Sequence, residues 1–200
     1  MPTPSFAPKT PPPGLRIHIF GHPDARPEEI ADLFGGKVAE SASADCDLAL
    51  FLIDPSLGID GQTIGNWEAL NESMPPRMVV VIGIENQEAD FDDAVLLANR
   101  VFDVTVTPFL VLHDDIGEPV ALISLLDLKI RDYSTNPPTI SESDPEHKTL
   151  VADFQNEYLA ALEVMGEDGF AAGLMFPAIP VSITRGIGVD IVEDYISKLA

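Results

Sequence analysis

Two continuous apolar runs constrain the fold of this 200-residue chain more than any other feature. Residues 48–53 read LALFLI and residues 78–84 read MVVVIGI, with no charged residue in either run. Runs of this length suit strands that are buried on both faces, as in a parallel sheet covered by helices. They are too short to cross a bilayer, which takes about 20 apolar residues. We therefore expect a layered α/β protein that does not span a membrane.

Amphipathic segments alternate with these runs. Residues 27–34 begin with Pro, carry acidic residues in the first turn and are followed by Gly35 and Gly36, which are helix start and stop signals. Similar patterns predict helices over residues 62–71, 91–102, 149–166 and 188–199, and short strands over residues 15–20 and 176–182. The alternation predicts one α/β domain with a mainly parallel sheet over residues 14–200.

Two segments depart from this alternation. Residues 107–147 contain two or three extended runs, a turn over residues 114–117 and a polar, Pro-rich loop, so we expect a small insertion there. Residues 1–13 contain six prolines and no apolar core of a signal peptide. We expect a disordered tail at residues 1–13 and a cytoplasmic protein.

Charge and cysteine content exclude several classes of function. The chain has 11 Lys and Arg against 33 Asp and Glu, a net charge of −22. Such a surface repels phosphate backbones and anionic lipids, so we expect no direct binding to nucleic acid or membranes.

Cys46 is the one cysteine, so neither an internal disulfide nor a Cys-based zinc site is expected. Its neighbours Asp45 and Asp47 should raise the pKa of its thiol.

Four stretches together resemble the G domain of the translational GTPases. Residues 47–62 (DLALFLIDPSLGIDGQ) are similar to the family's fourth strand and the loop after it, and residues 77–85 to its next strand. Residues 118–133 resemble the inserted subdomain of elongation factor G, and residues 176–199 the last strand and helix. The resemblance is greatest to elongation factor G-like proteins of actinobacteria. It implies a P-loop-GTPase-like three-layer fold with a small insertion like the G′ subdomain.

The resemblance also implies a reduced sheet. About 25 residues separate Phe20 from Cys46, where the family has several times more, so two strands, the first switch and the D-x-P-G-H element are missing. The remaining strands would keep the family's order 1-4-5-6 and leave strand 15–20 at an edge. Because exposed edges are usually covered, we expect that edge to meet the Pro-rich tail or a second subunit.

The residues that hold GTP in the family are replaced here. A phosphate-binding loop requires G-x-x-x-x-G-K-[ST], whereas residues 21–28 read GHPDARPE. Arg26, Pro27 and Glu28 stand where the second glycine, the lysine and the hydroxyl residue would be. The guanine-reading N-K-x-D becomes residues 82–85 (IGIE), and the late S-A pair becomes residues 182–183. The resemblance therefore implies loss of GTP binding and hydrolysis, with no catalytic residue, metal ligand or cofactor.

Six residues define a remnant nucleotide cleft on this alignment: Gly21, His22, Asp24, Arg26, Glu85 and Ser182. The leading hypothesis is a non-enzymatic pseudo-GTPase that acts through protein contacts, with strand 15–20 as the contact edge. As an alternative, the cleft binds a small molecule, an anion or weakly a nucleotide, with His22 and Arg26 near the start of helix 27–34. A protein without a retained role is a third alternative. His18, within strand 15–20, is expected to be a structural histidine with satisfied hydrogen bonds.

Overall fold

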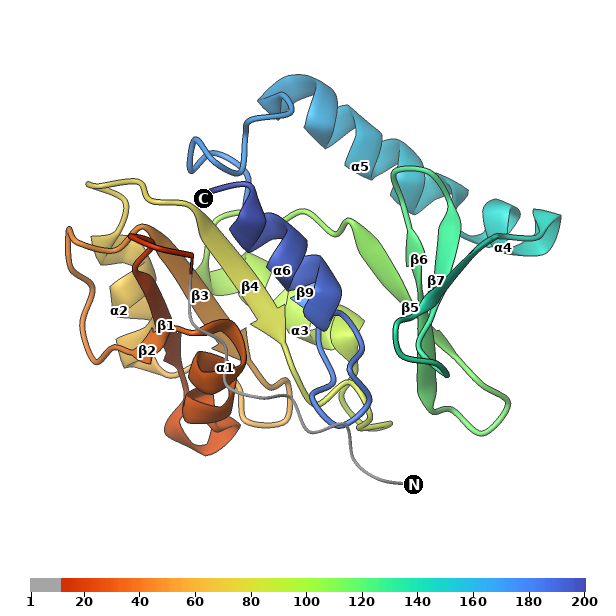
Figure 1. Ribbon diagram of the computed structural model, residues 1–200, viewed down its shortest axis with the longest axis horizontal. Coiled ribbons are helices and arrows are strands. Elements are labelled where there is room, and N and C mark those ends of the chain that lie inside the picture. The colour runs from red at the N-terminus through yellow and green to blue at the C-terminus, as the bar shows by residue number, and fades with distance from the viewer. Residues whose placement is uncertain (1–11) are drawn as a thin grey trace.

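The computed structural model describes residues 12–200, so nearly all of the predicted tail over residues 1–13 lies outside the described residues. The described chain forms a parallel sheet with helices on both faces and a separate antiparallel sheet beside it (Figure 1). This is the mixed α/β architecture predicted from the alternation of apolar runs and amphipathic segments. No helix in residues 12–200 is long and apolar enough to cross a membrane.

The main sheet contains five parallel strands in the order β2-β1-β3-β4-β9. These are β1 (Ile17–Gly21), β2 (Lys37–Val38), β3 (Leu48–Ile53), β4 (Arg77–Val81) and β9 (Ala178–Pro180). Strand β3 is the first apolar run, and β4 comprises Arg77 and the first four residues of the second run. Every residue in the two strands is buried. The order β1-β3-β4-β9 is the one expected for the four predicted strands.

The expectation that strand 15–20 lies at an edge is wrong. His18 pairs with Lys37 and Ile19 with Val38, so β2 covers the outer side of β1. The approach is close because Gly36 has no side chain: a Cβ there would lie 2.3 Å from Ile19 Cδ1. The sequence did not predict β2, because two residues are too few to show the alternation of a strand. Residues 37–45 were therefore expected to be a connection. The chain covers this part of the edge itself, and β2 takes the outermost place.

Four helices pack on the main sheet, α1 and α6 on one face and α2 and α3 on the other (Figure 1). They are α1 (Pro27–Phe34), α2 (Gly61–Ala69), α3 (Phe91–Val101) and α6 (Val189–Ser197), each close to its predicted range. Local signals explain their starts. The Asp60 carboxylate accepts a hydrogen bond from the Thr63 amide at 2.9 Å, and Asp90 and Asp93 form a capping box at α3.

Aromatic rings and one buried arginine fill the face under α2 and α3. The Trp67 ring lies 4.8 Å from Phe51, 4.3 Å from Phe102 and 5.1 Å from Phe176, measured between ring centroids. The guanidinium of Arg77 lies 4.7 Å from the centre of the Trp67 ring and donates to the Trp67 carbonyl oxygen at 3.1 Å. Burial lowers the pKa of Arg77, and the aromatic faces and the carbonyl take the place of water.

Residues 109–142 form the second sheet, with four antiparallel strands in the order β5-β6-β7-β8 where two or three extended runs were predicted. The strands are β5 (Phe109–His113), β6 (Pro119–Ser124), β7 (Lys129–Asp132) and β8 (Thr139–Glu142). The helix predicted over residues 149–166 is two helices, α4 (Pro145–Leu150) and α5 (Ala152–Met165). Figure 1 shows α5 running from the second sheet back toward the main sheet. Its buried residue is Tyr158.

Candidate functional site

The loop between β1 and α1 occupies the place of a phosphate-binding loop. It contains a short 3-10 helix, η1 (Pro23–Ala25). The Asp24 amide donates to His22 Nδ1 at 3.1 Å, the Ala25 amide to the His22 carbonyl oxygen at 2.9 Å, and the Arg26 amide to the Pro23 carbonyl oxygen at 3.3 Å. The next residue is a proline, without an N–H group. Three of the backbone amides at phosphate-loop positions are therefore bonded within the loop, and Pro27 has none to offer.

The glycine of this loop has a packing role. A Cβ at Gly21 would lie 2.9 Å from Leu52 Cβ and 3.0 Å from the Leu52 carbonyl oxygen, on the neighbouring strand β3. Such distances are shorter than van der Waals contact, so β1 and β3 need glycine at this register position. The single residue that matched the phosphate-loop pattern is thus explained by sheet packing.

Arg26 has a left-handed backbone with φ of 56° and precedes α1. Its guanidinium forms an ion pair with Glu29 in the first turn of that helix, at 3.0 Å. Both side chains are exposed, 66% for Arg26 and 45% for Glu29. Surface pairs of this kind contribute at most about 1 kcal/mol. With Glu28 also in the first turn, the start of α1 carries acidic groups where an anion would have to bind.

Glu85 and Ser182 come together at the carboxyl ends of β4 and β9. The Ser182 hydroxyl donates to the Glu85 carboxylate, and the Thr184 hydroxyl donates to the same oxygen at 3.3 Å. Ser182 Oγ also accepts from the Arg185 amide at 3.2 Å. Ser182 is 2% exposed, and its hydroxyl belongs to the turn over residues 182–187. This arrangement closes the loop that follows β9.

The structure therefore divides the predicted cleft into two groups. Gly21, His22, Asp24 and Arg26 lie in the β1–α1 loop, and Glu85 and Ser182 lie at the ends of β4 and β9. No hydrogen bond or ion pair within residues 12–200 joins one group to the other. We call these loops after β1, β4 and β9 the carboxyl edge.

Two other residues singled out by the sequence are buried in β1 and beside it. Both ring nitrogens of His18 lack a hydrogen-bond partner, so the expectation of a satisfied histidine is wrong. Burial lowers its pKa, and Lys37 lowers it further. The pKa of Cys46 is raised to about 11, mainly by burial and less by Asp47 and Asp45, so its thiol is an unreactive one.

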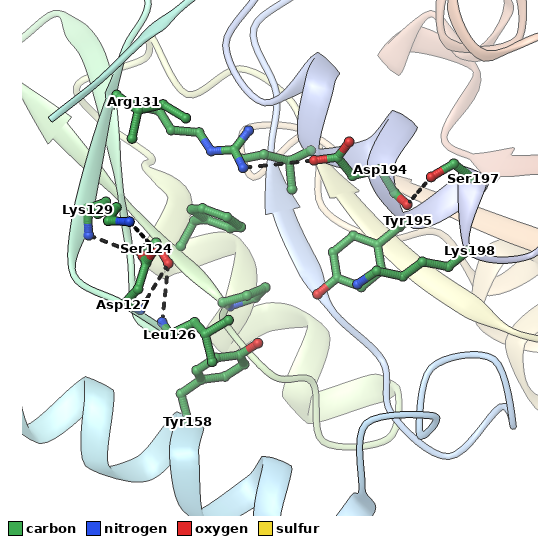
Figure 2. A pocket seen from close by; sticks show the side chains of 14 residues that line it. Ser124, Leu126, Asp127, Lys129, Arg131, Tyr158, Asp194, Tyr195, Ser197 and Lys198 are labelled. Atoms are coloured by element: carbon green, nitrogen blue, oxygen red, sulfur yellow. Dashed lines mark hydrogen bonds and ion pairs between the residues drawn. The ribbon is translucent and has the colours of Figure 1, made fainter.

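A cavity of about 500 Å³ lies between the second sheet and α6, which we call the inter-sheet cavity (Figure 2). Sequence reasoning missed it because its lining comes from segments up to 90 residues apart (108 to 198). Its apolar wall includes Phe109, Tyr158 and Tyr195, and Figure 2 shows the two tyrosine hydroxyls pointing toward each other. Burial raises the pKa of both tyrosines. None of the six predicted cleft residues lines this cavity.

Charged side chains form the rim of the inter-sheet cavity. Arg131 on β7 donates to Asp190 at 2.5 Å and lies 3.8 Å from Asp194, both on α6. Tyr133 donates to the second oxygen of Asp190 at 2.7 Å, and burial, with the Asp190 charge, raises the pKa of this tyrosine. These bonds attach the second sheet to the first turn of α6. Among residues 12–200, no group of three or more His, Cys, Asp or Glu could hold a metal ion.

Comparison with known proteins identifies relatives of the chain. No protein family model matches it. It is 26% identical over 199 residues to the elongation factor G-like protein of Mycobacterium tuberculosis, and the match covers 88% of this chain. It is 24% identical over 169 residues to the elongation factor G-like protein of Thermotoga maritima, covering 74% of this chain.

The chain is a relative of the elongation factor G-like proteins. It spans about a quarter of the length of these relatives, 26% and 24%. A crystal structure of a Thermus thermophilus protein is similar with a TM-score of 0.65 and 21% identity, over 83% of this chain and 30% of the other. That likeness supports the fold alone. The resemblance inferred from the strand and helix motifs is confirmed.

Proposed function

We propose that this chain is a pseudo-GTPase, a cytoplasmic protein with an elongation factor G-like G-domain fold that neither binds nor hydrolyses GTP and acts through protein contacts. The observation that carries the proposal is the β1–α1 loop. Its amides at residues 24, 25 and 26 are bonded inside the loop, and Pro27 has no amide hydrogen. Each hydrogen bond to a charged group contributes about 1.5–3 kcal/mol, so three or four missing bonds remove roughly 5–10 kcal/mol of binding.

Calorimetric titration with GTP and GDP, each with Mg²⁺, tests the loss of nucleotide binding. The missing bonds correspond to about four to seven decades of affinity, so no saturable heat is expected up to millimolar nucleotide. An active translational GTPase in the same buffer serves as the positive control. Micromolar affinity that depends on Mg²⁺ would overturn the proposal. Repeating the titration with inorganic phosphate tests the alternative that the remnant cleft binds anions.

An apolar groove between α3 and α5 supports the part of the proposal that concerns protein contacts. Its volume is about 420 Å³. Three of its apolar side chains are largely exposed: Leu96 at 60%, Val104 at 71% and Phe154 at 49%. Contiguous exposed apolar side chains mark interaction surfaces more often than isolated ones do. Asp92 also lines the groove, and burial raises the pKa of this carboxyl.

A pull-down from the native cell tests whether this groove carries protein contacts. The bait is the full chain, compared with a Leu96→Glu, Val104→Glu double variant that charges the groove. Leu57→Glu is the control, because Leu57 is 38% exposed and does not line the groove. We expect a partner that is lost with the double variant and retained with the control, and translation factors or ribosomes among the captured proteins. Capture that is equal for all three baits would reject the groove as the contact surface.

A further inference from the structure

The inter-sheet cavity has the size and position of a small-molecule site. Its volume of about 500 Å³ falls within the roughly 300–1,000 Å³ of ligand pockets. Strands β5 to β8 form one side, α6 the opposite side, and Tyr158 of α5 contributes to the lining (Figure 2). Junctions between separately built units are common places for such pockets.

The inner wall suits a flat ring. Phe109, Tyr158 and Tyr195 come from β5, α5 and α6, and Leu126 and Ile191 lie beside them. Phe109 also lies 5.7 Å from the Arg131 guanidinium, measured to the ring centroid. Aromatic rings from three separate elements around one cavity offer offset or edge-to-face contacts to a further ring.

The rim of the cavity differs in charge from the rest of the chain. Lys129, Arg131 and Lys198 line it, and the carboxylates beside them are Asp127, Asp194 and Asp190, which bonds to Arg131, so three positive and three negative charges balance. The whole chain carries −22, and it has only 11 Lys and Arg. A rim whose charges balance, in so acidic a chain, repels an anion less than the rest of the surface does.

Of these three cations, Lys198 carries the unmatched charge, because it alone has no carboxylate partner among residues 12–200. Lys129 lies 3.7 Å from Asp127, and Arg131 is held by Asp190 and Asp194. Lys198 Nζ lies 4.5 Å from the centre of the Tyr195 ring and takes part in none of the ion pairs found within residues 12–200. It has an exposed place on the rim, beside the aromatic wall.

We propose that the inter-sheet cavity is a binding site for a small aromatic monoanion, a ring that bears one carboxylate. The ring packs on the wall of Phe109, Tyr158 and Tyr195, and the carboxylate meets Lys198. This site is separate from the carboxyl edge and shares only Tyr158 with the lining of the groove between α3 and α5. The proposal holds whether or not the chain binds GTP.

Three probes with one ring system test the proposal: indole-3-acetate, its neutral amide and tryptamine, which is a cation. Each is titrated into the isotopically labelled full chain, and amide chemical shifts are followed by NMR. We expect indole-3-acetate to bind with shifts concentrated on the lining residues, and to bind about tenfold or more tightly than the amide. Equal affinity for the three probes, or no saturable shift with indole-3-acetate, would overturn the proposal.

Two lysine variants locate the anion. Lys198→Gln should weaken indole-3-acetate about tenfold and leave the amide unchanged, because it removes only the unmatched charge. Lys148→Gln on α4 removes the same charge outside the cavity lining and should change neither affinity. Leu126→Glu places a carboxylate on the rim at a side chain that is 60% exposed, so it should weaken the anion and strengthen tryptamine. Unchanged binding of the anion by Lys198→Gln would reject Lys198 as its partner.

Discussion

The carboxyl edge and the inter-sheet cavity differ in how their polar groups are used. At the carboxyl edge, the amides after His22 bond within the loop, and Ser182 and Glu85 bond to each other. At the cavity, charged side chains and three aromatic rings line about 500 Å³ of open space. Ligands of open α/β sheets usually bind at the carboxyl ends of the strands. Here a cavity of ligand size lies beside the sheet, where the second sheet meets α6.

The largest expected effect concerns the main sheet itself. Trp67→Ala should lower the free energy of unfolding by about 3–5 kcal/mol, because the side chain is 1% exposed and packs on three other rings. Ile140→Ala, at a side chain 59% exposed on β8, should change it by at most about 0.5 kcal/mol. Urea unfolding is followed by circular dichroism in both variants, since Trp67 is the only tryptophan and its fluorescence is lost on substitution. Similar losses for the two variants would show that the second sheet contributes as much stability as the first.

The strands and helices of the main sheet are also the part of the fold that the sequence predicts best. Its two central strands are continuous apolar runs, and α1 begins and ends at the predicted residues because Pro27 and Gly35 mark its limits. Strand β2 has two residues and no pattern of its own; its place depends on the fit of Gly36 against Ile19. A contact of this kind, between Gly36 and a side chain of the neighbouring strand, cannot be predicted from the local sequence.

The site was predictable only where a family motif could be aligned. The alignment identified Gly21, Arg26 and Glu85 as positions of interest, yet it could not show how their partners are arranged. Arg77 gave no signal either: it stands at the start of an apolar strand, and only packing against Trp67 explains its burial. The inter-sheet cavity is formed by the docking of α6 on the second sheet, and neither segment indicates it alone.

A second prediction concerns the contact that joins the two sheets. Asp190→Ala removes the acceptor of Arg131 at 2.5 Å and of Tyr133 at 2.7 Å. It should lower the free energy of unfolding by about 1–3 kcal/mol, since one donor is charged and the other is a partly buried hydroxyl. Asp194→Ala is the control, because Asp194 is 65% exposed and 3.8 Å from Arg131, and should cost less than about 0.5 kcal/mol. Equal effects in urea unfolding would mean that Asp190 does not hold the sheets together.

A third prediction uses His18, which lies in β1 just before the carboxyl edge. Burial lowers its folded-state pKa below the unfolded value of about 6.5, so below that pH the unfolded chain binds the proton more readily. The free energy of unfolding should therefore fall as pH decreases from about 6.5 to 5, by at most about 1.4 kcal/mol per pH unit. Urea unfolding across this range should show a flatter dependence for His18→Phe. His113→Gln, at an exposed histidine, is measured alongside for comparison. A steep slope in His18→Phe would assign the pH dependence to other groups.

The smallest expected effect tests the carboxyl edge directly. Arg26→Ala breaks only the exposed pair with Glu29, so the free energy of unfolding should change by at most about 0.5 kcal/mol. Inorganic phosphate should shift the thermal midpoint of Arg26→Ala and of the unaltered chain equally, because the loop amides are already bonded and the first turn of α1 is acidic. Lys148→Ala provides a variant of the same charge. If phosphate stabilised the unaltered chain and Lys148→Ala but not Arg26→Ala, the β1–α1 loop would still bind anions. The contrast between a carboxyl edge whose polar groups bond internally and an open inter-sheet cavity would then be lost, because both regions would bind an anion.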